Sequence, residues 1–270
     1  MPTLESTEVL RRNNVRDLGN PQGRPMLFAH GFGCNQAVWR DVAPAFLAEY
    51  RVILFDHVGA GGSDLSAYDR GKYDSLHGYA EDILQIIEAL DLTEVIFVGH
   101  SVGAMMGVLA ANRDPSRFAD LVLVGPSPRY VNDGDYIGGF EQADIDGLLD
   151  ALDANYLGWS ATMAPVIMGN PDRPELGQGL ADSFCSTDPT IGRHFAHVTF
   201  LSDNRSDLEA VSIPTLVLQC TDDVIAPDVV GEYVHQHIRG STLAVLRSTG
   251  HMPSLSGPAQ LIDEIQAYLR

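Results

Sequence analysis

Residues 95 to 103 read Val95-Ile96-Phe97-Val98-Gly99-His100-Ser101-Val102-Gly103, and residues 104 to 112 follow with helix-forming composition. An apolar run, a turn with the spacing Gly-x-Ser-x-Gly and a helix form the setting in which a nucleophilic serine is held at a sharp turn. The glycines have a steric role, because side chains at Gly99 and Gly103 would collide with the neighbouring strand and helix. By chance the pentapeptide occurs in roughly one chain in ten of this length, so the prediction that Ser101 is a nucleophile depends on its surroundings.

Similar apolar runs recur on both sides of this stretch, and each has the length of a buried parallel strand. Helical patterns separate several of them, as from Tyr79 to Leu90, where apolar residues recur at helical spacing. This alternation predicts an α/β fold with a doubly wound, mostly parallel sheet. The runs expected to form strands are Met26 to Ala29, Val52 to Phe55, Val95 to Val98, Leu121 to Val124, Thr215 to Cys220 and Leu243 to Leu246.

Between residues 127 and 207 the strand pattern stops. Helix-like stretches such as Asp144 to Tyr156 replace it, broken by Gly169-Asn170-Pro171 and Arg173-Pro174. The segment contains more large apolar and aromatic residues than a surface loop needs. We therefore expect a core formed by residues 1–126 and 208–270, with a helical cap at 127–207 over a pocket, and a terminal helix from Pro258 to Leu269.

A serine hydroxyl needs a base that holds a proton near neutral pH, and histidine has this property. Of nine histidines, His251 is the best placed, because it follows the run Leu243 to Leu246 through a short loop and precedes the last helix. It also completes the chain order serine, acid, histidine that accompanies this type of turn. His100 and His30 lie in loops with other expected roles, and His235 and His237 would face different sides of a helix.

The third member of such a site is a carboxylate that follows a strand and fixes the imidazole tautomer. Asp222 and Asp223 both follow the run Thr215 to Cys220. Adjacent side chains in an extended loop point in opposite directions, so only one of them can reach His251. Spacing alone does not choose between them.

An oxyanion that forms during attack on a carbonyl needs backbone N–H donors. Val102, directly after the nucleophile, is expected to supply one. The loop His30-Gly31-Phe32-Gly33 follows the first apolar run, and its paired glycines allow close approach of the backbone, so the Phe32 amide is expected to supply the other.

Composition excludes several classes of function. A formal net charge of -19 would repel phosphate backbones and anionic lipids, so neither nucleic acid nor a membrane surface is an expected partner.

The N-terminal residues lack the apolar core of a signal peptide, and no run of about 18 apolar residues could span a bilayer. Three cysteines without paired spacing fit a reducing cytoplasm. His194 and His197 share a helix face, but no acidic residue completes a metal set, so neither a metal nor a cofactor is expected.

The chain resembles the RsbQ-type α/β hydrolases of bacterial stress signalling and, more distantly, the plant strigolactone and karrikin receptors. The resemblance covers nearly the whole chain, and its cap motifs are more specific than its triad motifs. The motifs that carry it are Gly31 to Gln36 with Trp39, Val52 to Asp56 with Gly59 and Ser63-Asp64, Gly99 to Gly103, Val124 to Tyr130, Gly138 to Glu141, Asn155-Tyr156 with Trp159, Phe184 to Pro189, Ser202-Asp203, and Gly250-His251.

This resemblance implies an α/β-hydrolase fold with a four-helix, V-shaped cap, and it favours Asp223, four residues before Pro227, as the acid of the triad. It also implies a deep apolar pocket. Met163 departs from the pattern of the plant receptors, which tend to carry an aromatic residue there, so their ligand preference is not expected to transfer. The expected pocket residues are His30, Phe32, Tyr130, Phe140, Trp159, Met163 and Phe200.

Two functions follow from these observations. The first is a serine hydrolase that cleaves a small hydrophobic ester or lactone through an acyl-enzyme, an activity that could be coupled to stress signalling. The second is a ligand-sensing protein with slow hydrolysis, which by the resemblance would regulate a phosphatase partner carrying a PAS domain. Ser101 excludes dehalogenases of this fold, which need a carboxylate nucleophile, whereas carbon–carbon bond hydrolysis and perhydrolysis would use the same triad.

Overall fold

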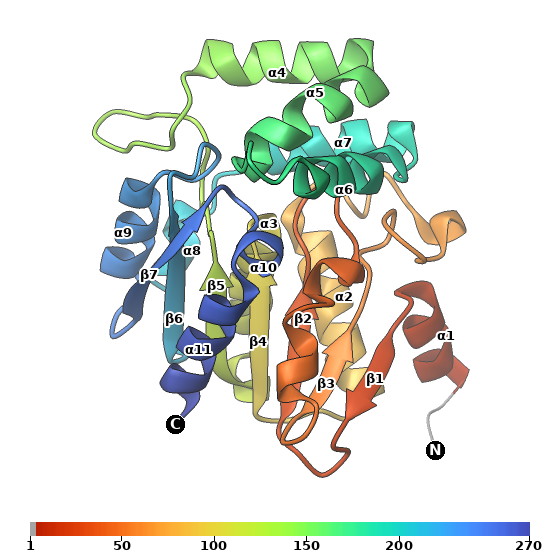
Figure 1. Cartoon of the computed structure of the whole chain (residues 1–270). Helices are drawn as coiled ribbons and strands as arrows, with labels where there is room; N and C mark the ends of the chain where they lie inside the picture. Colours follow the sequence, from red (N-terminus) through yellow and green to blue (C-terminus); the bar gives the residue numbers. More distant parts are fainter. Residues whose placement is uncertain (1–3) are drawn as a thin grey trace.

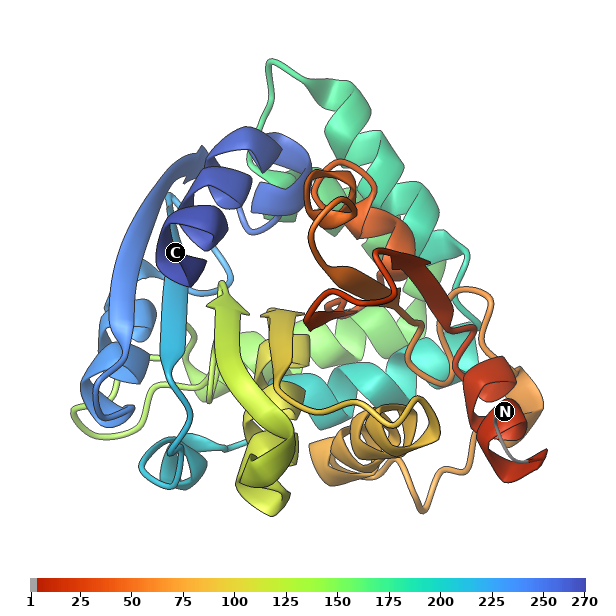
Figure 2. The ribbon, with the colours of Figure 1, turned by 90° about the horizontal axis from the view of Figure 1, so that it is seen from below.

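A twisted seven-stranded sheet lies at the centre of the structure, a computed structural model that describes residues 4–270. The strands lie in the order β1-β3-β2-β4-β5-β6-β7, and all neighbours are parallel except β1 and β3. Seen from below, the sheet crosses the molecule from the N-terminal edge to β7 (Figure 2). The strands are β1 (Arg16–Gly19), β2 (Pro25–Ala29), β3 (Arg51–Leu54), β4 (Val95–His100), β5 (Phe118–Val124), β6 (Thr215–Thr221) and β7 (Thr242–Thr249).

All six predicted strands are present, which confirms the doubly wound, mostly parallel sheet. The predicted strand residues in β2 to β6 are buried because helices cover both faces, whereas β7 at the sheet edge is partly exposed, with Val245 51% exposed. The sequence did not predict β1. Its four residues, Arg16–Gly19, are mostly exposed and contain no apolar run, so only antiparallel pairing with β3 at the sheet edge makes this segment a strand.

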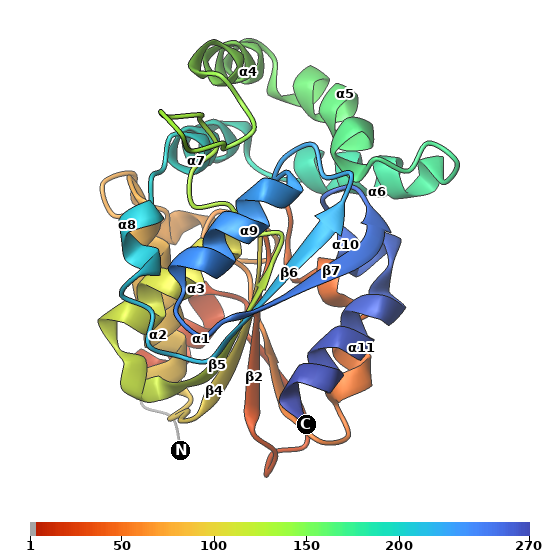
Figure 3. The same ribbon diagram turned by 90° about the vertical axis from the view of Figure 1, so that its left-hand side faces the viewer.

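Helices cover the two faces of the sheet (Figure 3). One face packs against α2 and α3, with contributions from α8 and α9, and the other against α11 and the short helices η1 and η2. No helix of residues 4–270 is long and apolar enough to cross a membrane. Outside the segment 127–207 the helices are α1 (Leu4–Arg12), η1 (Gln36–Trp39), η2 (Ala43–Phe46), η3 (Leu65–Ala67), α2 (Leu76–Ala89), α3 (Val102–Arg113), η4 (Pro115–Arg117), α9 (Asp228–His237), α10 (Pro253–Ser256) and α11 (Pro258–Leu269).

The N-terminal stretch that was expected to lack a signal peptide begins with residues 1–3, which lie outside the described residues. From residue 4 onward this stretch forms the amphipathic helix α1, which packs on α2. The predicted terminal helix, Pro258 to Leu269, is present with the same bounds as α11. Proline at its first position fits this start, because the missing N–H would have no helical acceptor there.

Four helices between β5 and β6 cover the carboxyl ends of the strands, with α4 and α5 above α6 and α7 (Figure 1). The predicted helix Asp144 to Tyr156 is in fact divided. Asn155 ends α4, and its side chain accepts a hydrogen bond from the Gly158 amide and so begins α5. Gly169, in a left-handed conformation, ends α5 as a C-cap. The helices of this segment are α4 (Gln142–Ala154), α5 (Tyr156–Met168), α6 (Pro174–Cys185) and α7 (Pro189–Phe200), followed by α8 (Arg205–Leu208).

Candidate active site

Ser101 lies at the turn between β4 and α3 with φ 56° and ψ -125°, a conformation that non-glycine residues rarely adopt. The flanking glycines make this turn sterically accessible. A Cβ atom at Gly99 would lie 2.7 Å from the Ala104 Cα, and one at Gly103 would lie 2.4 Å from the His30 carbonyl oxygen. The turn therefore needs glycine at both positions, and it raises Ser101 above the carboxyl edge of the sheet.

His251 links Ser101 to a carboxylate. Its Nε2 lies 2.8 Å from the Ser101 Oγ, and its Nδ1 lies 2.7 Å from the Asp223 Oδ2. All three residues are at most 6% exposed. With Nδ1–H donating to Asp223, Nε2 is free to accept the serine proton, which is the arrangement that general-base catalysis requires.

Only Asp223 reaches His251, whereas Asp222 is exposed. The expected reason was wrong, because the loop is not extended here: Asp222 lies in a turn and adopts a left-handed conformation with φ 55°. The second carboxylate oxygen of Asp223 accepts hydrogen bonds from the amides of Ile225 (2.9 Å) and Ala226 (3.1 Å). Burial by itself raises the pKa of Asp223, but the charge of His251 and these hydrogen bonds together lower it below its usual value. The carboxylate that faces His251 is therefore ionised at neutral pH.

His100 supports the histidine loop from inside the fold. Its Nε2–H donates to the carbonyl oxygen of His251 at 2.7 Å. Burial, followed by the charge of His251, lowers the pKa of His100 to about 3, so this ring is neutral at pH 7. Sequence reasoning rejected His100 as a base but missed this positioning contact, because the two residues are 151 positions apart in the chain.

Four other histidines contact groups other than the Ser101 hydroxyl. His30 Nε2 accepts a hydrogen bond from the His57 amide, and His57 Nε2–H donates to the His30 carbonyl. His194 contacts the Tyr68 hydroxyl, and His197 pairs with Asp153. Within residues 4–270, no group of three or more His, Cys, Asp or Glu residues is arranged to hold a metal ion.

The expected oxyanion donors lie on either side of the nucleophile. Val102 is the first residue of α3, and amides in the first turn of a helix have no acceptor within that helix. The loop that contains Phe32 approaches Ser101 closely, since a Cβ at Gly31 would lie 3.2 Å from the Ser101 Cβ. Both amides thus belong to segments that border Ser101, and their role as oxyanion donors stays a prediction.

A small, largely apolar cavity of about 30 Å³ adjoins the serine and the histidine. This volume is about a tenth of the lower end for typical ligand sites, roughly 300 Å³, so side chains nearly fill the space. The residues lining it are Phe32, His100, Ser101, Tyr130, Ile167, Phe184, Thr199, Phe200, Ile225, His251 and Met252.

Three of the seven expected pocket residues, Phe32, Tyr130 and Phe200, line this cavity. The other four lie outside its lining, and their role as substrate contacts stays a prediction. Among them, Trp159 contacts the Phe32 ring edge-on and stacks on Phe184. The His30 ring accepts a hydrogen bond from the His57 amide in the neighbouring loop. Phe140 and Met163 are partly buried against the core. Of the other lining residues, Phe184 belongs to a cap motif but was not predicted to line the pocket, and Ile167, Thr199, Ile225 and Met252 were missed because no motif marks them.

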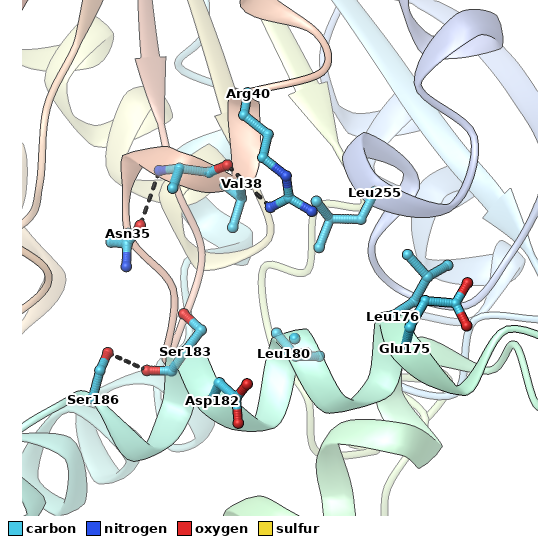
Figure 4. Close-up of a pocket in the computed structure, with 12 residues that line it drawn as sticks. Asn35, Val38, Arg40, Glu175, Leu176, Leu180, Asp182, Ser183, Ser186 and Leu255 are labelled. Carbon is cyan, nitrogen blue, oxygen red and sulfur yellow. Dashed lines mark hydrogen bonds between the residues drawn. The ribbon is translucent and has the colours of Figure 1, made fainter.

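A separate hollow of about 290 Å³ lies between η1 and α6 (Figure 4). Its polar side chains come from α6 and from the residues that flank η1, but the hydroxyls of Ser183 and Ser186 donate to the carbonyls of Gly33 and Ser183. It contains no histidine that could activate a serine. Although it is larger, this hollow lacks the chemistry found around Ser101.

A family model described as alpha/beta hydrolase fold matches residues 24–258. The strigolactone esterase D14 of Arabidopsis thaliana is 39% identical and covers 98% of this chain and 99% of its own length. The karrikin insensitive 2 receptor CA of Petunia hybrida is 39% identical, with 95% of each chain covered. A hydrolase structure from Oleispira antarctica superposes with a TM-score of 0.92 at 39% identity, covering 97% of each chain. These matches confirm the expected fold and the resemblance to the plant receptors.

Proposed function

This chain belongs to the α/β hydrolase family, and from that premise we propose that it is a serine hydrolase that cleaves a small hydrophobic ester or lactone. The observation that carries the proposal is the continuous contact from Ser101 through His251 to Asp223, with separations of 2.8 and 2.7 Å. A buried serine, an imidazole and an ionised carboxylate in this order are the groups that acyl transfer needs.

In the proposed reaction, Ser101 Oγ attacks the carbonyl carbon of the ester while His251 Nε2 accepts its proton. Asp223 holds the imidazole in the required tautomer and stabilises its charged form. The amides of Phe32 and Val102 donate to the oxygen that becomes negative. His251 then returns the proton to the leaving alcohol, and a water molecule activated by the same imidazole hydrolyses the acyl-enzyme.

The cavity supports a compact, apolar substrate. Its lining consists mainly of aromatic and aliphatic side chains, which offer few hydrogen-bond partners to a peptide, and its volume is only about 30 Å³. Binding of a whole ester requires side chains around the serine to move. A small acyl group with few polar atoms needs the least rearrangement.

The test is incubation of the purified protein with p-nitrophenyl acetate and several synthetic lactones, beside the Ser101→Ala variant. We expect rapid release of product by the wild-type protein and its loss in the variant, with an adduct mass on Ser101 trapped at early times. Equal release by both proteins, or no reaction of the wild-type protein with any of these compounds, would contradict the proposal.

A second candidate is a ligand-sensing protein with slow hydrolysis, which the receptor named among the relatives favours. The structural observation behind it is direct contact between the cap and the histidine loop: the His251 amide donates to the Ile167 carbonyl. Occupation of the cavity could then change the cap surface that a partner, such as a PAS-domain phosphatase, recognises. All three cysteines are unpaired, which fits the cytoplasm where such a partner would act. A single slow turnover with a retained adduct would favour this candidate over a metabolic esterase.

A further inference from the structure

Thr199 lines the cavity beside Ser101. It lies on α7, next to Phe200, and is 1% exposed. Its Oγ1 atom is buried and has no hydrogen-bond partner within residues 4–270. A buried hydroxyl without a partner is costly, so an unpaired one that borders a binding cavity points to a partner that arrives with the ligand.

Two hydroxyls on α5, by contrast, are satisfied within their own helix. Ser160 and Thr162 on α5 donate to the carbonyl oxygens of Tyr156 and Gly158, four residues earlier, at 2.8 and 2.9 Å. This is the usual solution for serine and threonine within a helix. Thr199 does not adopt it, although the backbone carbonyl of Thr199 itself accepts from the Ser202 hydroxyl.

Of the polar groups that line the cavity, Thr199 Oγ1 and His100 Nδ1 are buried without a hydrogen-bond partner within residues 4–270. Because the Nε2–H of His100 donates to the His251 carbonyl, its Nδ1 can only accept and cannot donate to a substrate oxygen. The Ser101 hydroxyl and the His251 imidazole bond to one another, and the Tyr130 hydroxyl interacts with Ser101. Ile167, Phe184, Phe200, Ile225 and Met252 supply only apolar side chains to the wall. Thr199 is therefore the unpaired side chain that can donate a hydrogen bond to a ligand oxygen away from the scissile bond.

We propose that Thr199 is a specificity-determining residue whose hydroxyl donates to a second oxygen of the substrate, an ether or carbonyl oxygen beyond the ester or lactone group. An acceptor oxygen satisfies the threonine hydrogen without bringing a further hydrogen into the apolar cavity. The substrate class is thus narrowed from any small hydrophobic ester to an oxygen-containing one. This inference rests on the proposed hydrolase function.

The test compares Thr199→Val, which keeps the shape and removes the hydroxyl, with Thr162→Val, an exposed control on α5. Substrates are matched pairs of p-nitrophenyl esters in which one CH₂ group is replaced by oxygen: butanoate and methoxyacetate, pentanoate and 3-methoxypropanoate, hexanoate and 4-methoxybutanoate. In at least one pair, we expect Thr199→Val to lower kcat/KM for the ether ester about 3- to 10-fold more than for its carbon counterpart. Thr162→Val should change both members of every pair equally. Equal effects of Thr199→Val on both members in all three pairs would overturn the inference while leaving the hydrolase proposal intact.

Thermal unfolding provides a second readout that does not depend on turnover. Because the hydroxyl lacks a partner, Thr199→Val should unfold at the same or a higher temperature than the wild-type protein. A lower Tm would show that the hydroxyl has a partner within the protein, and would contradict the inference. If the wild-type protein hydrolyses no ester, the proposed function is contradicted, but the role of Thr199 can still be tested by binding. Calorimetry then compares the affinities of methyl pentanoate and methyl 3-methoxypropanoate for Ser101→Ala and for the double variant that also carries Thr199→Val.

Discussion

The backbone amide of His251 donates a hydrogen bond to the carbonyl oxygen of Ile167 at 3.0 Å, so the end of cap helix α5 holds the loop of the candidate base. A second contact reinforces this one. The Asn170 side-chain amide donates to the carbonyls of Met168 and Thr249, at 2.6 and 2.9 Å. The position of the cap and the position of the imidazole are therefore mechanically linked.

Gly250 tests this link. It has φ 85°, and a Cβ atom there would lie 1.9 Å from the Met168 carbonyl oxygen. Gly250→Ala should both strain the backbone and push α5 away from the loop, which displaces His251. We expect a lower Tm and a loss of about 10- to 100-fold in kcat/KM, measured by thermal unfolding and p-nitrophenyl ester hydrolysis.

Gly240 is the matched control, because it has φ 75° but no atom within 4 Å of the added Cβ. Gly240→Ala should lower Tm by a few degrees through backbone strain alone and leave kcat/KM unchanged. Similar activity in the two variants would show that the cap contact does not position His251.

The pair of adjacent aspartates provides a second prediction. In Asp223→Asn, the new amide group can donate to His251 Nδ1, which leaves a proton on Nε2 facing Ser101 and blocks its action as a base. We expect kcat to fall by about three to four orders of magnitude without loss of folding. Asp222→Asn, at the exposed neighbour, should retain activity. Steady-state kinetics and circular dichroism measure both effects, and a fully active Asp223→Asn protein would exclude Asp223 from the triad.

Acid should destabilise the protein in part through His100. Burial lowers the pKa of its imidazole from 6.5 to about 3, so between these values the unfolded chain binds a proton that the folded chain does not. The free energy of unfolding therefore falls as the pH falls below about 6.5, and His100 contributes nothing to this slope at higher pH. His100→Gln keeps a hydrogen-bond donor but cannot titrate, and should reduce the slope by up to ~1.4 kcal/mol per pH unit. Urea unfolding at pH 7, 6 and 5 measures the slope; identical slopes in both proteins would refute the assignment.

Phe32 separates two small cavities, and its removal should change substrate preference. Its ring meets Trp159, Phe184, Phe195 and Phe200 at centroid distances of 5.6 to 6.2 Å. It lines both the cavity at Ser101 and a second one of about 10 Å³ near His57 and Tyr156. Phe32→Ala joins the two spaces.

We therefore expect the ratio of kcat/KM for p-nitrophenyl octanoate over acetate to rise about tenfold in Phe32→Ala, together with a lower Tm from lost packing. Phe140→Ala serves as the control, because Phe140 packs against the core outside the cavity lining. If Phe140→Ala changed this kcat/KM ratio and Phe32→Ala did not, the acyl chain would contact Phe140 rather than Phe32, which would contradict the prediction.

The sheet was largely predictable, because strands buried on both faces must be continuous apolar runs. The edge strand β1 was not, since its pairing with β3 depends on a neighbour rather than on its own side chains. The division of the first predicted cap helix was also missed. There, the Asn155 side chain accepts a hydrogen bond from a backbone amide of the following helix, so the chain starts a new helix instead of continuing the first. Apolar periodicity does not reveal such a cap.

The sequence was sufficient to predict the turn around Ser101, the strands along the chain and His251 as the candidate base, because backbone sterics and strand burial act over a few neighbouring residues. The contacts of Asp223, His100 and Ile167 with His251, and the place of Thr199 at the cavity, arise only in the folded chain. These contacts join residues that are far apart in the sequence, 28 positions for Asp223 and His251 and 151 for His100 and His251. They depend on how the cap and the loops pack in space, which no local pattern encodes.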